Sequence, residues 1–346
     1  MRRFVILAMA AGMLPGSAAA RPLAHTFSIV ARDPVTGEMG VAVQSHWFSV
    51  GPLVPWAEGG VGAVATQSFV DMSYGPRGLA LMRQGLSAPE ALAKLLAEDS
   101  ERDVRQVAMV DAQGRVAVHT GAKCIAGAGD TTGDGFTCQA NLMQNDRVWG
   151  AMARAFASAK GDLADRMLAA LEGGQAAGGD VRGRQSAAIL IVKGETSDRP
   201  WNDKVLELRV EDHPEPIREL ARLVRLRRAY DQADLGDREL AAHRVEAAKA
   251  AYARASELAP GNEELLFWKA AGLYKSGEAK EALPLFRRVF RVRPDWALVV
   301  PRLSGLDILA GSPEEFALAV DRILAVAPPA ARRAALAEWK KRSGRE

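Results

Sequence analysis

The stretch TFSIVARDPVTGEMGVAVQS at residues 26–45 sets the pattern for the first half of the chain. Two runs rich in Val, Ile and Ala, 27–31 and 40–45, lie on either side of a polar segment that contains Pro34 and Gly37. Apolar, β-branched runs bounded by turn residues are typical of β-strands. We therefore predict two successive strands joined by a turn.

Similar runs recur along the chain as far as about residue 212. The sequence predicts further strands at residues 61–68, 104–110, 116–120, 186–192 and 205–210. Stretches rich in Ala and Leu predict helices at residues 75–84, 88–98, 148–158 and 163–171. Strands, then helices, then strands again indicate an α+β unit, in which antiparallel sheet is covered by helices.

Composition limits the function classes. A chain of 346 residues predicts about two or three domains, and 48% hydrophobic with 25% charged residues is an ordinary globular composition. The 45 Lys and Arg residues nearly balance the 42 Asp and Glu residues, which argues against nucleic acid as a partner. No run approaches the roughly 18 apolar residues of a membrane span. The five histidines form no pair at metal-ligand spacing, so we expect no metal and no cofactor.

The first twenty residues have the three parts of a secretory signal peptide. Two arginines precede an apolar run at residues 4–14, and three alanines end at Ala20. We therefore expect residues 1–20 to be removed and the protein to be exported, to the periplasm or the extracellular space. Export would place Cys124 and Cys138 in an oxidising compartment, where they either form a disulfide or remain two buried thiols.

The strand-like runs stop after residue 213, and a repeating helical pattern follows. Prolines recur at a 34-residue interval, at Pro260, Pro294 and Pro328. Small or apolar residues precede each proline at three fixed distances: twelve residues before it (Ala248, Ala282, Phe316), eight before it (Tyr252, Phe286, Val320) and five before it (Ala255, Val289, Ile323). The pattern resembles tetratricopeptide (TPR) repeats over about residues 228–328. It implies an all-α repeat domain at residues 214–346 that recruits a protein partner or the substrate. Phe316 is larger than the family prefers and Pro301 interrupts a helix, so we expect the last repeat to be an atypical cap.

Five motifs carry a second resemblance. They are TFSIVARDP at 26–34, GVAVQS at 40–45, GVGAVATQS at 60–68, YGPRG at 74–78 and GGDVRGRQSAA at 178–188. Together they resemble the bacterial domain-of-unknown-function family 1028, which is grouped with the N-terminal-nucleophile (Ntn) hydrolases. The resemblance covers about residues 25–213 and implies a four-layer αββα sandwich for residues 21–213. The family is uncharacterised, so the resemblance does not settle the activity.

The resemblance implies a catalytic role for Thr26. In Ntn hydrolases the first residue of the mature domain is the nucleophile, and its own α-amine is the general base. An α-amine with a pKa of about 7.7–8.0 is close to its titration point at neutral pH. A cut after Ala20 would leave five residues ahead of Thr26, so this role requires a second cut, such as the self-cleavage usual in the superfamily. The alternative is that Thr26 is an ordinary strand residue.

Other polar residues gather where the predicted strands begin and end. Asp180 and Arg182 are candidates for orienting groups in catalysis, and the remaining residues are candidates for binding or auxiliary roles (Ser45, Gln67, Asn141, Gln185, Ser186). Each is equally suited to satisfying backbone groups at a strand end or turn.

Three hypotheses for the function follow. The first is an exported Ntn-type hydrolase that cleaves an amide bond in an unknown small-molecule or peptide substrate. The second is a non-catalytic exported binding protein on the same scaffold, and the third is a protein whose function lies in the repeats alone. The sequence leaves open whether the chain forms a homo-oligomer.

Overall fold

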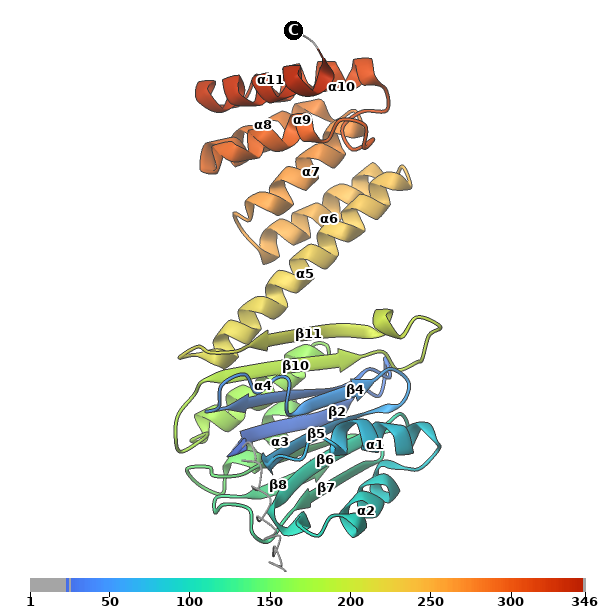
Figure 1. Cartoon of the computed structure of the whole chain (residues 1–346), viewed down its shortest axis with the longest axis vertical. Coiled ribbons are helices and arrows are strands. Elements are labelled where there is room, and N and C mark those ends of the chain that lie inside the picture. Colours follow the sequence, from blue (N-terminus) through green and yellow to red (C-terminus); the bar gives the residue numbers. More distant parts are fainter. Residues whose placement is uncertain (1–22, 25, 345–346) are drawn as a thin grey trace, which may run out of the picture. The chain divides into compact units, whose positions relative to one another are not determined.

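The computed structural model of the chain describes residues 23–24 and 26–344, and it divides into two compact units between Leu220 and Ala221 (Figure 1). The first unit combines sheets and helices, and the second is all-helical. The predicted order, an α+β unit followed by a helical unit, is confirmed. The division falls within helix α5 (Pro216–Ala241), a few residues beyond the boundary expected after residue 213. The predicted signal peptide lies outside the described residues.

The first unit contains two antiparallel sheets. The first sheet has the order β1-β5-β6-β7, with β4 also paired to β5: β1 (Leu23–Ala24), β4 (Pro55–Glu58), β5 (Gly62–Phe69), β6 (Arg105–Asp111) and β7 (Val116–Thr120). The second sheet has the order β11-β10-β3-β2-β9-β8: β2 (Thr26–Arg32), β3 (Met39–Ser45), β8 (Gly129–Gly133), β9 (Phe136–Ala140), β10 (Ser186–Val192) and β11 (Lys204–Val210). The strands β2 and β3 are the hairpin that the opening stretch predicts.

The two sheets pack face to face over an apolar core. Alternate residues of their central strands point into this core, among them Val30, Val43, Ala65, Ala108 and Ala188. The other face of the first sheet is covered by α1 (Tyr74–Arg83) and α2 (Ala88–Glu98), and that of the second by α3 (Val148–Ser158) and α4 (Leu163–Ala176) (Figure 1). The apolar alternation along each strand therefore serves two cores, one between the sheets and one beneath the helices.

Helix α4 continues beyond its predicted end at residue 171. It passes through Gly173 and Gly174, which weaken a helix when no packing compensates for them. A Cβ atom at Gly173 would lie 2.7 Å from the Cβ of Ala155, and one at Gly174 would lie 2.7 Å from the side chain of Met152. The two glycines thus allow α3 and α4 to pack closely, and this contact keeps the segment helical.

The second unit is a series of short helices after α5. They are α6 (Val245–Leu258), α7 (Glu263–Lys275), α8 (Ala279–Val292), α9 (Val299–Arg302), α10 (Pro313–Leu324) and α11 (Pro329–Ser343), with a 3-10 turn at Pro294–Leu298. Helices α6, α8 and α10 end shortly before the three periodic prolines. The nine small and apolar positions that precede those prolines are all buried. Pro301 lies in α9, which has only 4 residues.

The packing of α8 gives a test of the periodic pattern. Ala282 is fully buried in one cluster with Phe267 and Phe286. Because the cluster has no room for an indole, Ala282→Trp should lower the free energy of unfolding by about 1–3 kcal/mol or more, measured by urea denaturation. The exposed Lys280→Ala on the same helix is the control and should change it by less than about 0.5 kcal/mol. Equal small effects would show that the pattern does not reflect packing.

Candidate functional site

Three of the predicted site residues form a row of hydroxyls across the second sheet. Thr26 of β2 lies opposite Ser45 of β3, and Ser45 lies opposite Ser186 of β10. All three residues are fully buried. The Thr26 hydroxyl donates a hydrogen bond to Ser45 Oγ at 3.2 Å, and the Ser186 hydroxyl donates to the carbonyl oxygen of Trp47 at 2.6 Å. They share the strand face that lies toward the first sheet, so the row sits between the sheets.

Two further predicted residues hold the backbone of Thr26. The backbone nitrogen of Asn141, just after β9, donates to the Thr26 carbonyl oxygen at 3.1 Å. The side-chain nitrogen of Gln67, on β5 of the facing sheet, donates to the same oxygen at 3.1 Å. The Thr26 carbonyl is therefore fixed from both sheets.

A buried amide network surrounds this contact, and it joins the predicted Gln67 and Asn141 through Gln106, which the sequence did not indicate. Gln67 donates to Gln106 Oε1 at 2.8 Å and accepts from the Ser28 hydroxyl at 2.7 Å, while Asn141 Nδ2 donates to Gln106 Oε1 at 2.9 Å. Gln106 in turn donates to the Ala140 carbonyl oxygen at 2.9 Å. Because buried hydrogen-bonding groups are costly to leave unpaired, these side chains fix the positions of β2, β5, β6 and β9 relative to one another.

Asp180 and Arg182 tie the segment after α4 to the end of β3. The Asp180 side chain is fully buried, and its carboxylate accepts from the backbone nitrogen of His46 at 3.2 Å. The Arg182 guanidinium donates to the same carboxylate at 2.7 Å. These contacts hold the strand end that carries Ser45.

Gln185 is the predicted residue whose side chain lies away from the row. Its side-chain nitrogen donates to Asp212 Oδ1 at 3.2 Å on the exposed surface. Its backbone nitrogen donates to the Ser45 carbonyl oxygen at 3.1 Å. Gln185 therefore contributes to the site through the main chain.

The backbone is strained next to two of these residues. Ser68 follows Gln67 with a φ of 69°, and Leu142 follows Asn141 with a φ of 57°. A non-glycine residue in this left-handed region costs on the order of 1–3 kcal/mol, and such residues cluster at functional sites. The strain thus marks the same end of the sheets as the hydroxyl row.

The two cysteines are free thiols in the structure, so the disulfide considered between them is not formed. Cys138 is fully buried on β9, with its neighbours fixed by pairing to β2 and β8, and burial raises the pKa of its thiol. Cys124 lies after β7, where its sulfur contacts the carbonyl oxygen of Arg105 at 3.3 Å, and desolvation raises its pKa also.

The described part of the chain holds no cluster of three or more His, Cys, Asp or Glu side chains that could bind a metal ion. None of the helices within residues 26–344 combines the length and the apolar character needed to cross a membrane.

One protein family and one solved structure are similar to the first unit of the chain. The sequence model described as "Family of unknown function (DUF1028)" matches residues 26–220. The crystal structure of protein SPO2555 from Silicibacter pomeroyi, whose description gives the same family, is 33% identical. The alignment covers 58% of this chain and 84% of that chain, with a TM-score of 0.52. No curated protein matches the chain.

The amide network can be tested through stability. Gln106→Met keeps the size of the side chain but removes the partners of Gln67, Asn141 and the Ala140 carbonyl. We expect the free energy of unfolding to fall by about 1–3 kcal/mol for each group left unpaired. The control Gln84→Met, at an exposed position, should change it by less than about 0.5 kcal/mol. A loss no larger than the control's would mean that the network does not hold the sheets together.

Proposed function

Because the chain belongs to the family of unknown function DUF1028 and its match begins at Thr26, we propose that the first unit is an Ntn-type hydrolase that cleaves an amide bond. Thr26 is its nucleophile. The observation that carries the proposal is the position of Thr26, at the first residue of β2 and at the end of a buried row of hydroxyls. Two face-to-face sheets between pairs of helices support the assignment of the unit as a four-layer αββα sandwich of the Ntn type.

In the proposed reaction the Thr26 hydroxyl oxygen attacks the amide carbonyl carbon, and the hydroxyl proton passes to the free α-amine of Thr26. The C–N bond then breaks, and the leaving nitrogen takes up that proton to depart as an amine. Water hydrolyses the ester left on Thr26, which releases a carboxylic acid and restores the hydroxyl. The substrate is a small-molecule or peptide amide.

This mechanism requires processing before Thr26. Leu23 and Ala24 pair with Phe69 and Ser68 in the first sheet, whereas Thr26 begins a strand of the second sheet. The chain therefore passes from one sheet to the other immediately before Thr26, and cleavage there would release β1 and expose the amine. We propose that export removes the signal peptide and that self-cleavage removes the remainder, in the periplasm or outside the cell.

The other residues of the site have supporting roles in this proposal. Ser45 accepts the hydrogen bond of the nucleophilic hydroxyl and so orients it. Gln67 and Asn141 hold the Thr26 backbone, and Asp180 with Arg182 fixes the end of β3. In the second unit, the buried periodic positions support TPR-type repeats that recruit a partner or the substrate.

One observation favours a second function, a non-catalytic exported binding protein. In the chain described here Thr26 is fully buried and its hydroxyl is engaged with Ser45. A residue in that state cannot reach a substrate, so without processing the same scaffold could bind a ligand but not cleave it.

The nucleophile can be tested by substitution in protein that begins at residue 26. Thr26→Ala should abolish hydrolysis of a panel of acyl p-nitroanilides, because it removes the attacking oxygen. Thr26→Ser should retain part of the activity. The alanine variant loses one hydrogen bond and should lose no more than about 1–2 kcal/mol of stability, measured by urea denaturation. Hydrolysis that survives Thr26→Ala would remove Thr26 from the mechanism.

A further inference from the structure

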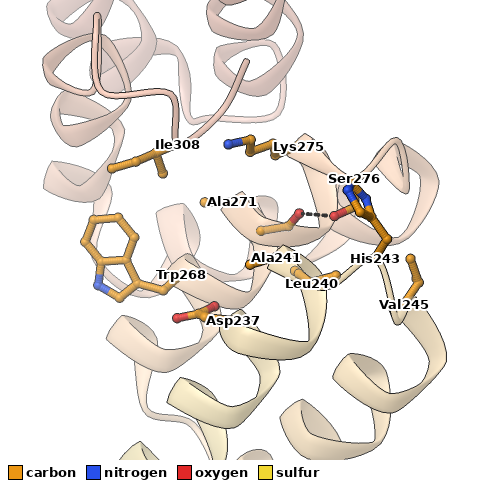
Figure 2. Close-up of a pocket in the computed structure, with 11 residues that line it drawn as sticks. Asp237, Leu240, Ala241, His243, Val245, Trp268, Ala271, Lys275, Ser276 and Ile308 are labelled. Atoms are coloured by element: carbon orange, nitrogen blue, oxygen red, sulfur yellow. Dashed lines mark hydrogen bonds between the residues drawn. The ribbon is translucent and has the colours of Figure 1, made fainter. Parts of the chain in front are cut away.

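The helical unit contains a cavity of about 770 Å³ that has no role in the proposed hydrolysis (Figure 2). Its walls come from the end of α5 and the segment that leads into α6, from α7 and the residue after it, and from the segment between α9 and α10. This volume falls within the range of about 300–1,000 Å³ that is usual for small-ligand pockets. The cavity is therefore large enough for a compact ligand or a long side chain.

A glycine keeps the cavity open between the two helices. A Cβ atom at Gly272 of α7 would lie 2.7 Å from the Leu240 side chain and 3.0 Å from the Tyr252 hydroxyl. Any larger residue would push α5 and α7 apart or displace the tyrosine. The shape of the pocket thus depends on the absence of a side chain at this position.

One carboxylate in the pocket forms no ion pair with any described residue, although Arg238 lies near enough to lower its pKa. Asp237 of α5 accepts a hydrogen bond from the Tyr252 hydroxyl at 2.5 Å, and within the described residues no Lys, Arg or His forms an ion pair with it. Two basic residues line the pocket, Lys275 and His243, and Lys275 is already paired with Asp307 at 2.9 Å. The lining therefore offers a carboxylate that is not held in a salt bridge, and burial raises its pKa.

An aromatic ring and apolar side chains complete the pocket. Figure 2 shows the Trp268 indole and the Asp237 carboxylate on the same side of the cavity, with Ile308 beyond the ring. The indole packs edge-on against Phe267, with ring centroids 5.1 Å apart, and this contact fixes its orientation. A carboxylate and an indole ring on the same side of a pocket favour organic cations, because both groups attract positive charge and the ring also contacts hydrocarbon.

We propose that this pocket binds a primary ammonium or guanidinium group on a hydrocarbon stem, with Asp237 as its counter-ion and Trp268 as its aromatic wall. The stem would lie along Leu240, Ala271 and Ile308. Two sources have this chemistry, a free alkylamine and the side chain of a Lys or Arg residue in a peptide. The inference does not depend on Thr26 chemistry.

The test uses the full chain with ¹⁵N-labelled tryptophan. The indole N–H signal of Trp268 is assigned by its loss in Trp268→Phe. Butylamine, agmatine and the capped peptides acetyl-Gly-Lys-Gly-amide and acetyl-Gly-Arg-Gly-amide are titrated in turn, with acetyl-Gly-Glu-Gly-amide as the anionic control. We expect the cations to shift the signal saturably and the anionic peptide to leave it in place. Tighter binding of the peptides than of the free amines would identify a protein side chain as the ligand, and the reverse would identify a small amine.

A matched pair of variants separates a binding contact from general surface charge. Asp237→Asn keeps an acceptor for Tyr252 but removes the charge, and it should weaken cation binding by about tenfold. Asp234→Asn makes the same charge change one turn earlier on α5 and should weaken it by less than about twofold. Absence of a saturable shift, equal losses in the two variants, or equal binding of the glutamate peptide would each overturn the proposal.

Discussion

The hydrogen bond from the Gln67 side chain to the Thr26 carbonyl oxygen is the contact on which the arrangement of the first unit depends. It joins two sheets whose facing surfaces are otherwise mainly apolar, and apolar contacts alone leave the relative position of two sheets loosely specified. A buried amide that must find its partner specifies that position. Gln106 and Asn141 extend the same constraint to the neighbouring strands. The end of the sheets that carries Thr26 is therefore the most closely specified part of their interface.

Much of the fold could be predicted from residue patterns. Most strands of the two sheets are either continuously apolar or alternate between apolar and polar residues, and helices α1 to α4 are rich in Ala and Leu. The hairpin of β8 and β9 was missed. Its first strand reads GDTTG, a composition more typical of a turn, and it forms a strand because β9 pairs with it along its length. The end of α4 was missed for a related reason, since Gly173 and Gly174 break helices unless another helix packs against them. In both places a partner from another part of the chain decides the local structure.

Prediction of the candidate site was limited in the same way, by contacts with distant parts of the chain. The residues at strand ends could be named from the sequence, and the register of β2, β3 and β10 brings Thr26, Ser45 and Ser186 together. Gln106 could not be named, because a single glutamine in the strand RQVAMVD looks like a solvent-facing residue until the second sheet is placed over it. Gln185 was expected in the site, but Asp212 offers its side chain a partner on the surface. The pocket at Asp237 escaped prediction because its lining comes from three separate segments.

The proposed chemistry requires the Thr26 nitrogen to be a free amine. As long as residue 25 precedes it, that nitrogen is an amide and cannot accept a proton from the hydroxyl. The most direct measurement is the intact mass and N-terminal sequence of the exported protein, taken from the same fraction that hydrolyses an amide. The account predicts a chain that begins at Thr26. An active fraction whose chain begins at Arg21 would contradict it.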